Sequence, residues 1–429
     1  MAATGFTLLG IFIVLLLLEV PISISLGLSS AIVLVAFHIR SLSAVPTLFF
    51  GAMDHVGLLA IPYFIIAGLI LGRSGISRRL IDFASTLIGD VPGGLAIVGV
   101  VVSIFFAGIS GSGPADVAAL GMVMIPAMTE AGYGKGFSAA LMAAGGGIGI
   151  IVPPSIALVV YGIVADAAIP KLFIAGIFPG MLVGLSLIAY VYHVSAWRGY
   201  RAGRERGSAK EIAVAFGRAF WGLLAPVIIL GGIYGGVFTP TEAAAVAVVY
   251  ALFVDVFIYR EMSLKDVFNV FVESGITSAQ VLIVVACASL FSFVLKYEGI
   301  VEAASQWLIG HASNRYVFLL LANVVLLMAG CLMDAISIFY VFLPILMPVV
   351  RHFGIDPIHF GVIMTVNLAI GQITPPVGVN LFVASGVSGV SMNRLYLAIL
   401  PFIAVEALAL LLVTLLPSIS LALPAWLGM

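Results

Sequence analysis

The chain has 429 residues, of which 63% are hydrophobic and 9% are charged, and its formal net charge is −1. Soluble domains carry roughly 25% charged residues, so this composition excludes an ordinary soluble protein and predicts a polytopic membrane protein. The balanced charge also gives no sign of a nucleic-acid partner. Continuous apolar runs, such as 172–197 and 221–241, favour helices over a β-barrel, and the length accommodates roughly ten to twelve spanning segments.

The N-terminal segment, residues 1–57, is expected to form part of a scaffold. Its apolar run 6–37 is too long for one ordinary span and is interrupted by Glu19 and Pro21. The run therefore forms either one long kinked helix or two short ones. No basic residue precedes Arg40, which argues against a signal peptide, so the segment is expected to stay in the membrane.

Basic residues give the predicted orientation. Arg73, Arg78 and Arg79 follow the first span of a predicted repeat 1, which covers residues 58–197. The polar loop 198–218 carries six Lys or Arg residues against two Glu. The positive-inside rule places both regions in the cytoplasm. Connecting scaffold helices are expected to follow this cytoplasmic basic loop, over residues 219–276.

Within repeat 1, a re-entrant helical hairpin is predicted at about 92–131. Its two apolar pieces, 95–108 and 117–128, are both shorter than the roughly 20 residues that a span needs. Between them lies a tip rich in Gly and Ser, whose backbone bends easily and exposes carbonyl, amide and hydroxyl groups. Such a hairpin enters the membrane, turns at mid-depth and leaves on the same side.

A broken helix is predicted next, at about 136–168, because Pro153 and Pro154 interrupt an apolar stretch. Proline removes an amide donor and moves the preceding residue out of the helical region, so Val152 should mark an unwound break. Free carbonyl groups at such a break suit a cation such as sodium, and the positive end of a half-helix suits an anion. The alternative is a simple proline kink that neighbouring side chains satisfy.

The same pattern recurs 222 residues downstream. Residues 147–155 (Gly-Ile-Gly-Ile-Ile-Val-Pro-Pro-Ser) align with residues 369–377 (Ala-Ile-Gly-Gln-Ile-Thr-Pro-Pro-Val). The surrounding windows 108–179 and 330–401 each hold six prolines, and four of these coincide where random placement would give about 0.5. The chain is therefore predicted to contain an internal duplication.

Repeat 2 is predicted over residues 277–429, with a hairpin at about 316–351 and a broken helix at about 357–390 that is interrupted beside Thr374. The spans between the repeats place it in the opposite orientation to repeat 1. The predicted fold is thus an all-α polytopic membrane protein with two inverted structural repeats, each with a re-entrant hairpin and a Pro-Pro broken helix. Secondary transporters use this design and bind substrate near the midplane between the repeats.

The hairpin tips and the breaks supply the candidate binding residues. The candidate sodium ligands are Ser110, Gly111, Ser112, Gly149, Val152, Pro153, Asp334, Gly371, Thr374, Pro375 and Gly378. The candidate substrate-binding residues are Ser112, Gly113, Pro154, Ser155, Pro376 and Asn380. Lys296 is a weaker candidate, since an interfacial lysine at the end of an apolar run is the favoured interpretation. Asp334 is included because a carboxylate within the membrane is a functional candidate by default.

The motifs also resemble those of a known family. The stretches Ser-Gly-Ser-Gly-Pro-Ala-Asp (110–116) and Ile-Thr-Pro-Pro-Val-Gly-Val-Asn (373–380), with the paired Pro-Pro breaks, resemble the large membrane subunit of TRAP transporters. The likeness covers essentially the whole chain. It implies sodium-driven, ATP-independent uptake of organic acids, such as sialic acid or C4-dicarboxylates, across the bacterial inner membrane.

The resemblance further implies two protein partners, a small four-helix membrane subunit and a periplasmic substrate-binding protein, in a setting of membrane lipid. Its fold is similar to that of the sodium-coupled divalent-anion symporters, which implies an elevator motion of hairpins and broken helices against a scaffold. The alternatives are a stand-alone sodium/carboxylate symporter and, less favoured, an ion channel. An enzyme is not expected, because no nucleophile-and-base pattern is present, and the lack of a Walker A motif argues against direct use of ATP.

Overall fold

The computed structural model describes residues 2–201 and 206–429, and this part of the chain contains helices and no strands. Seven of its helices are long and apolar enough to cross a membrane. The prediction of an all-helical polytopic membrane protein is therefore confirmed. Residues 202–205 of the predicted basic loop, and Met1, lie outside the described residues.

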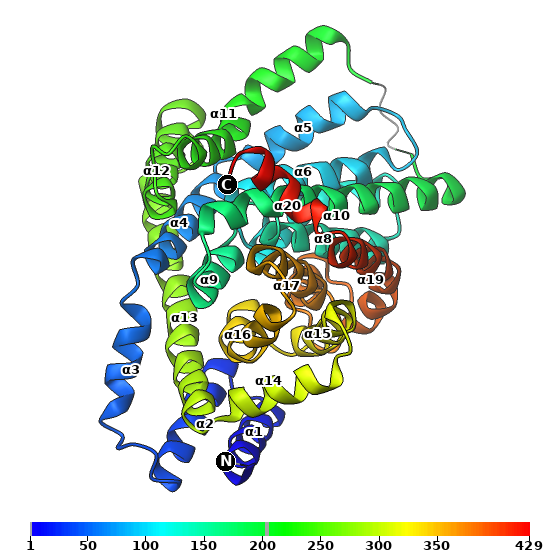
Figure 1. The fold of residues 1–429 in the computed structure, drawn as a ribbon. Coiled ribbons are helices and arrows are strands. Elements are labelled where there is room, and N and C mark those ends of the chain that lie inside the picture. The colour runs from blue at the N-terminus through cyan, green and yellow to red at the C-terminus, as the bar shows by residue number, and fades with distance from the viewer. Residues whose placement is uncertain (1, 202–205) are drawn as a thin grey trace.

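Figure 1 shows the order of the helices along the chain. The first half contains α1 (Ala2–Leu17), α2 (Ile22–Ala36), α3 (Ala44–Met53), α4 (Ala60–Arg73), α5 (Ile76–Ile88), α6 (Gly94–Ser110), α7 (Gly113–Glu130), α8 (Lys135–Gly147), α9 (Ile156–Ala165) and α10 (Ile169–Arg198). The second half contains α11 (Ala209–Tyr234), α12 (Pro240–Phe253), α13 (Leu264–Tyr297), α14 (Ile300–His311), α15 (Arg315–Gly330), α16 (Ala335–His352), α17 (Pro357–Gly371), α18 (Val379–Ser388), α19 (Met392–Leu415) and α20 (Ser418–Trp426).

The N-terminal run is two helices, which decides between the two possibilities that the sequence left open. α1 ends at Leu17, Glu19 adopts a left-handed backbone conformation with φ of 61°, and Pro21 precedes the first residue of α2. Proline in the interior of a continuous helix would remove a backbone hydrogen bond, so the chain turns here and starts a new helix. The two helices pack against each other at one edge of the molecule (Figure 1).

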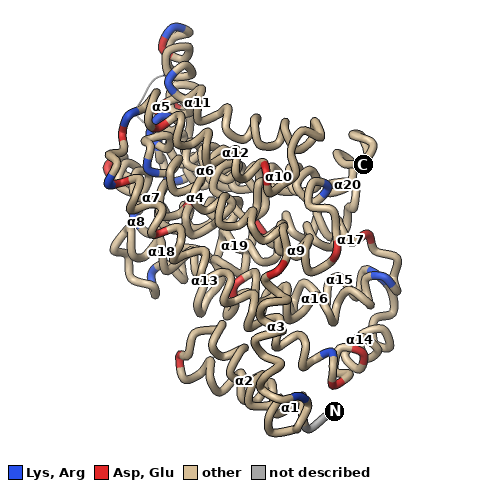
Figure 2. Tube along the Cα trace, turned by 90° about the vertical axis from the view of Figure 1, so that its left-hand side faces the viewer, with Lys and Arg blue, Asp and Glu red and all other residues tan. Residues whose placement is uncertain are grey.

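Helices extend through two of the predicted boundaries. The basic loop was expected to reach residue 218, but α11 already begins at Ala209, where Ser208 and Glu211 form a capping box. Similarly, the predicted boundary at 276/277 lies inside α13, a continuous helix of 34 residues. Polar residues in the first turns of α11 resemble loop sequence, and so do Glu273, Ser274 and Gly275 within α13. Figure 2 shows Lys and Arg residues grouped near α5 and the start of α11.

The predicted hairpins and breaks correspond to helix ends. α6 and α7 meet at Gly111–Ser112, and α15 and α16 meet at residues 331–334. α8 continues into a short 3-10 turn, Ile148–Ile150, and stops before the Pro153–Pro154 pair, while α17 stops before Pro375–Pro376. Both Pro-Pro bonds are cis. The insertion of these helix pairs into a bilayer stays a prediction.

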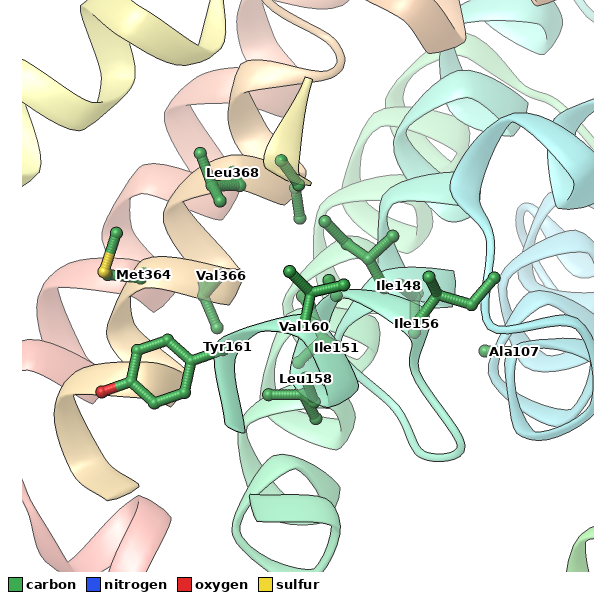
Figure 3. Close-up of a cluster of buried hydrophobic side chains, with 14 of the residues drawn as sticks. Ala107, Ile148, Ile151, Ile156, Leu158, Val160, Tyr161, Met364, Val366 and Leu368 are labelled. Atoms are coloured by element: carbon green, nitrogen blue, oxygen red, sulfur yellow. The ribbon is translucent and has the colours of Figure 1, made fainter. Parts of the chain in front are cut away.

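The two half-helices that precede the breaks form the centre of the molecule. Every residue of α8 from Phe137 onward is buried, and so is every residue of α17 from Ile358 onward. The run Gly145–Gly147 lets their backbones approach, since a Cβ at Gly147 would lie 3.4 Å from the Ala369 carbonyl oxygen. Figure 3 shows the apolar side chains between the first break and α17, including Met364, Val366 and Leu368. Both breaks are therefore held in a close-packed interior.

Gly361 gives a test of this packing. A Cβ there would overlap the ring of Tyr161, which is fully buried and donates a hydrogen bond to the Pro357 carbonyl oxygen at 2.6 Å. Overpacking of a core costs about 1–3 kcal/mol. We expect Gly361→Ala to lower the thermal unfolding temperature in detergent by several degrees. The control is Gly275→Ala on α13, where a Cβ meets nothing within 4 Å. Equal unfolding temperatures for both variants would contradict the close contact.

Candidate functional site

The first tip, Ser110–Gly113, lies against the first break, Ile151–Ser155. The backbone amide of Ile156 donates to the Gly111 carbonyl oxygen at 3.4 Å. Gly111 has a φ of 62°, and a Cβ there would lie 2.6 Å from the Pro154 carbonyl oxygen. Only glycine fits both the backbone conformation and this approach. The tip therefore covers the unwound backbone that the Pro-Pro pair creates.

The second tip, residues 331–334, lies against the second break, residues 372–378, in a related way. The amide of Val377 donates to the Cys331 carbonyl oxygen at 3.3 Å. Gly330 and Gly371 bring α15 and α17 into backbone contact, since a Cβ at Gly371 would lie 2.7 Å from the Cα of Gly330. The structure thus brings together the predicted tips and breaks in two pairs.

The two pairs meet at the centre of the molecule. A Cβ at Gly113 of the first tip would overlap the side-chain oxygen of Gln372 and lie 3.1 Å from Nδ2 of Asn380. Asn380 is fully buried, and its Nδ2 donates to the Ala143 carbonyl oxygen at 3.2 Å. The same Nδ2 would lie 3.4 Å from a Cβ at Gly146. Residues of the first tip, the first half-helix and the second break therefore share one small region.

Three side-chain oxygens in and beside this region have no hydrogen-bond partner among the described residues. They are Oδ2 of Asp116, Oε1 of Gln372 and Oδ1 of Asn380. Asp116 is fully buried in the first turn of α7, and its other oxygen accepts a hydrogen bond from the Ser110 hydroxyl. A Cβ at Gly149 would overlap Asp116 Oδ2, so this oxygen points at the backbone of the first broken helix. Buried acceptors without donors are unfavourable, and a bound cation would satisfy them.

Several predicted ligands have local structural roles. Ser155 is fully buried and caps α9, with its hydroxyl bonded to the Ile150 carbonyl oxygen and accepting from the Leu158 amide. The Thr374 hydroxyl donates to the Ile370 carbonyl oxygen at 2.6 Å. Asp334 is half-buried and caps α16 by accepting from the amide and hydroxyl of Ser337, at 3.0 and 2.6 Å. Each of these oxygens keeps at least one lone pair for a ligand.

The remaining predicted residues are backbone ligands or lie elsewhere. Val152, Pro153, Pro154, Pro375, Pro376 and Gly378 all lie in the two breaks, where their carbonyl groups would be the ligating atoms. The Pro376 carbonyl oxygen accepts from the Tyr396 hydroxyl. Lys296 is exposed in the last turn of α13, about 28 Å along this helix from Thr277, which lines the cavity described next. The structure therefore does not bring Lys296 to the first tip.

A cavity of about 670 Å³ leads to the first tip. Ser110 and Ser112 form one end, and small side chains of α7, including Ala115 and Ala118, form a wall. Charged residues also line the cavity, namely Arg73, Arg78, Glu261 and Glu273. Residues of the second tip and second break do not line it. The first tip is therefore accessible from the face that carries these arginines, where the side chains of Arg73 and Glu273 are 41% and 48% exposed.

The sequence places Asp116 in the 110–116 motif but did not identify it as a candidate ligand, and it gave Arg73 only as a marker of orientation; Gln372 and Glu273 were missed. The signal for Asp116 was an acid six residues after Ser110, at the start of a helix. Gln372 lies inside the duplicated stretch and is the polar residue closest before Thr374. Within the described residues, no cluster of three or more His, Cys, Asp or Glu side chains could hold a metal ion, so any cation here would rely largely on amide, hydroxyl and carbonyl oxygens.

The chain matches a known family over almost its whole length. The model of the family "Tripartite ATP-independent periplasmic transporter, DctM component" matches residues 9–419. The C4-dicarboxylate TRAP transporter large permease protein of Pseudomonas aeruginosa is 44% identical over 94% of this chain and 95% of its own length. The isethionate TRAP transporter permease protein of Oleidesulfovibrio alaskensis is 45% identical over 96% of this chain, but the match spans only 65% of that longer protein.

Among solved structures, the YdaH transporter of Alcanivorax borkumensis is similar to this chain. The TM-score is 0.60, and the match covers 90% of this chain and 87% of that one. The sequence identity is 16%, so this likeness concerns the fold alone. The helical arrangement described above is thus one that a membrane transporter is known to adopt.

Proposed function

The chain belongs to the DctM component of the tripartite ATP-independent periplasmic transporters, and we propose that it translocates small organic acids into the cell with sodium as the coupling ion. It is a multi-pass protein of the bacterial inner membrane and a transporter rather than an enzyme. The observation that carries the proposal is the meeting of both tip–break pairs around buried oxygens without donors. Such a centre can hold cations beside an anionic substrate.

The proposed sodium sites combine two kinds of oxygen. Backbone carbonyls of the breaks, near Gly149–Pro153 and Gly371–Pro375, are the predicted ligands, with the hydroxyls of the tips. The unpartnered oxygens of Asp116, Gln372 and Asn380 support this proposal, because a cation would offset the free-energy cost of burying them. Sodium binding would supply positive charge at the centre. The residues themselves hold the ion and orient the tips over the breaks.

The proposed substrates are organic acids, such as C4-dicarboxylates or sialic acid. One relative carries a C4-dicarboxylate name and another an isethionate name, and both names describe small organic anions. In this chain, Ser110 and Ser112 line the cavity, and Arg73 and Arg78 add positive charge to its lining. Hydroxyl and guanidinium groups are suitable partners for a carboxylate.

We propose two protein partners, a small four-helix membrane subunit and a periplasmic substrate-binding protein. α3 has no buried residue, although it is apolar. Phe50 of α3 is exposed, and α1 exposes large apolar side chains as well, including Phe6 and Leu17. Membrane lipid or an apolar partner subunit must cover these surfaces. The longer isethionate relative, of which this chain spans 65%, has room for an additional segment.

The proposed mechanism is an elevator motion in which tips and breaks move together against the other helices. In this structure the cavity reaches the first tip but not the second. Two tip–break pairs of related design offer two related arrangements, one open to each side of the membrane. A sodium ion that enters down a potential of 100 mV contributes about 2.3 kcal/mol to drive the change.

Uptake by purified protein in proteoliposomes tests this function. We expect accumulation of an organic acid to require an inward sodium gradient and to require both the small subunit and the binding protein. Sodium-driven uptake by this chain alone would instead favour a stand-alone symporter. Conductance far above carrier turnover would favour a channel. Sodium, voltage and the binding protein are varied separately in the assay.

Asp116→Asn tests the sodium site. The substitution removes the charge of a buried carboxylate that has one unpartnered oxygen, so sodium should bind more weakly. We expect the sodium concentration for half-maximal uptake to rise about tenfold, equivalent to about 1.4 kcal/mol of binding free energy. Sodium, compared with potassium, should also stabilise the wild type against heat more than the variant.

The matched control is Asp166→Asn, because Asp166 is an exposed acid at the end of α9 in a left-handed conformation that asparagine tolerates. Normal sodium dependence in Asp116→Asn would show that Asp116 holds no coupling ion.

Cysteine labelling tests the motion. Ala118→Cys, with Cys287 replaced by Ala, places one thiol in the cavity wall, and the native Cys331 reports on the second tip. Each thiol would be examined in a variant that lacks the other one, with a membrane-impermeant reagent applied to either face. We expect the two thiols to be reached from opposite faces, and their accessibility to change in opposite directions when sodium and substrate are added. If both remain accessible from one fixed face in a variant that transports, the elevator proposal fails.

A further inference from the structure

The cavity contains an ion pair between Arg73 and Glu273, and we propose that it is exchangeable. In this proposal the carboxylate of Glu273 occupies the place on Arg73 that the carboxylate of a transported organic acid takes during its release. The inference rests on the proposed function, because it assigns the groups by which this cavity receives and releases an anionic substrate. Arg73 is then a residue that contacts substrate, and Glu273 is a tethered competitor.

A second pair beside the same cavity shows what a fixed ion pair looks like here. Arg79 contacts Glu261 at 2.7 Å, and its other terminal nitrogen donates to the Ser74 carbonyl oxygen at 3.0 Å. Its guanidinium carbon also lies 3.9 Å from the centroid of the Tyr259 ring. Three different groups thus hold this guanidinium in place. Removing any one partner would leave the other two.

Arg73 has far fewer constraints than Arg79. It ends α4, and within the described residues its side chain makes one hydrogen-bonded ion pair, through Nη2 to Glu273 on α13, with Asp266 near enough to act on it only through its charge. A guanidinium has five N–H donors, so most of those on Arg73 are available to another acceptor. Both partners line the cavity and are about half exposed. Because water competes for exposed ion pairs, they contribute little net stability and exchange readily.

The position of Arg73 suits an anion that leaves the first tip. Gly68 of α4 touches this tip, since a Cβ there would lie 3.1 Å from the Cα of Ser110. Arg73 lies five residues further along the same helix, roughly 7.5 Å along its axis. The wall between them consists of small side chains such as Ala115 and Ala118, which offer no competing polar group. An anion released from the tip therefore next meets the guanidinium of Arg73.

Glu273 explains how such an anion would leave again. A carboxylate that binds an arginine through two hydrogen bonds would dissociate more slowly if no other carboxylate competed for the guanidinium. A carboxylate attached to the neighbouring helix competes at a high effective concentration and displaces it. Arg78, a second cavity arginine with no ion pair to any described residue, keeps the lining attractive to anions while Arg73 and Glu273 are paired. The pair thus allows both entry and departure.

The test compares Glu273→Gln with Arg73→Gln in proteoliposomes that contain the full chain with its partners. Radiolabelled succinate and isethionate serve as probe anions, and the half-saturating concentration is measured on the face that carries Arg73. We expect Glu273→Gln to lower this concentration about fivefold and to slow net release, because Arg73 is left without a competitor. Arg73→Gln should raise the half-saturating concentration about fivefold, because the carboxylate of Glu273 then remains without a positive partner and repels the anion.

Arg73→Lys separates direct contact from a general effect of charge. Lysine keeps the positive charge but lacks the planar guanidinium that binds a carboxylate through two hydrogen bonds. We therefore expect Arg73→Lys to behave like Arg73→Gln. Wild-type half-saturation in Arg73→Lys would overturn the proposal, because the field of the charge alone would then suffice.

Variants of the Arg79–Glu261 pair show how an ion pair with a purely structural role should behave. Arg79→Gln and Glu261→Gln should both lower the thermal unfolding temperature and change half-saturation in the same direction. The surface pair Arg201–Asp90, at 3.6 Å, serves as a distant control, and Asp90→Asn should leave transport unchanged. If Glu273→Gln and Arg73→Gln also shift half-saturation in the same direction, their pair is only structural and the proposal is overturned. If the wild type takes up neither anion nor sialic acid with sodium, the proposed function fails and the inference fails with it.

Discussion

The contact between each tip and its break is the interaction on which the rest of the structure depends. A Pro-Pro pair in an apolar interior leaves backbone groups without helical partners, and an unpaired polar group there is unfavourable. The amides of Ile156 and Val377 find carbonyl partners on Gly111 and Cys331, across from each break. Glycines at 111, 330 and 371 make this approach possible, and the burial of α8 and α17 holds the breaks in place. The candidate site exists because these helices stop in the middle of the molecule.

The two halves of the site use an acid and a serine in different ways. In the first half, the Ser110 hydroxyl at the end of α6 donates to Asp116 in the first turn of α7, so the hydrogen bond closes the tip. In the second half, Asp334 and Ser337 belong to one helix start, and the acid caps α16. Both arrangements place a carboxylate beside the positive end of a helix. Of these two carboxylates, only that of Asp116 is left with an unpartnered oxygen, so a bound ion would offset a larger free-energy cost at Asp116 than at Asp334.

Residues that break helices could be predicted from the sequence, whereas contacts between distant segments could not. Proline and glycine act on the local backbone, so the ends of α8, α9, α17 and α18 follow from their positions along the chain. Gln372 gives no such signal, and its relation to Gly113 arises only when segments more than 250 residues apart pack together. The pair Arg73–Glu273 likewise joins two helices that are distant in sequence. The predicted sodium ligands, the inverted repeats and the membrane depth of the tips stay predictions.

The length of α13 links the site to the lipid around it. At 1.5 Å per residue, its 34 residues extend about 51 Å, well beyond the roughly 30 Å of a hydrocarbon layer. Its first turns carry Lys265, Asp266 and Glu273, while the apolar remainder from Ser274 to Leu295 extends about 33 Å. A hydrocarbon layer spanned by this apolar remainder would end close to Glu273. A thinner or thicker bilayer would tilt α13 or draw Glu273 toward the apolar layer, so under the proposed exchange at Arg73 the membrane thickness would affect how readily an anion leaves.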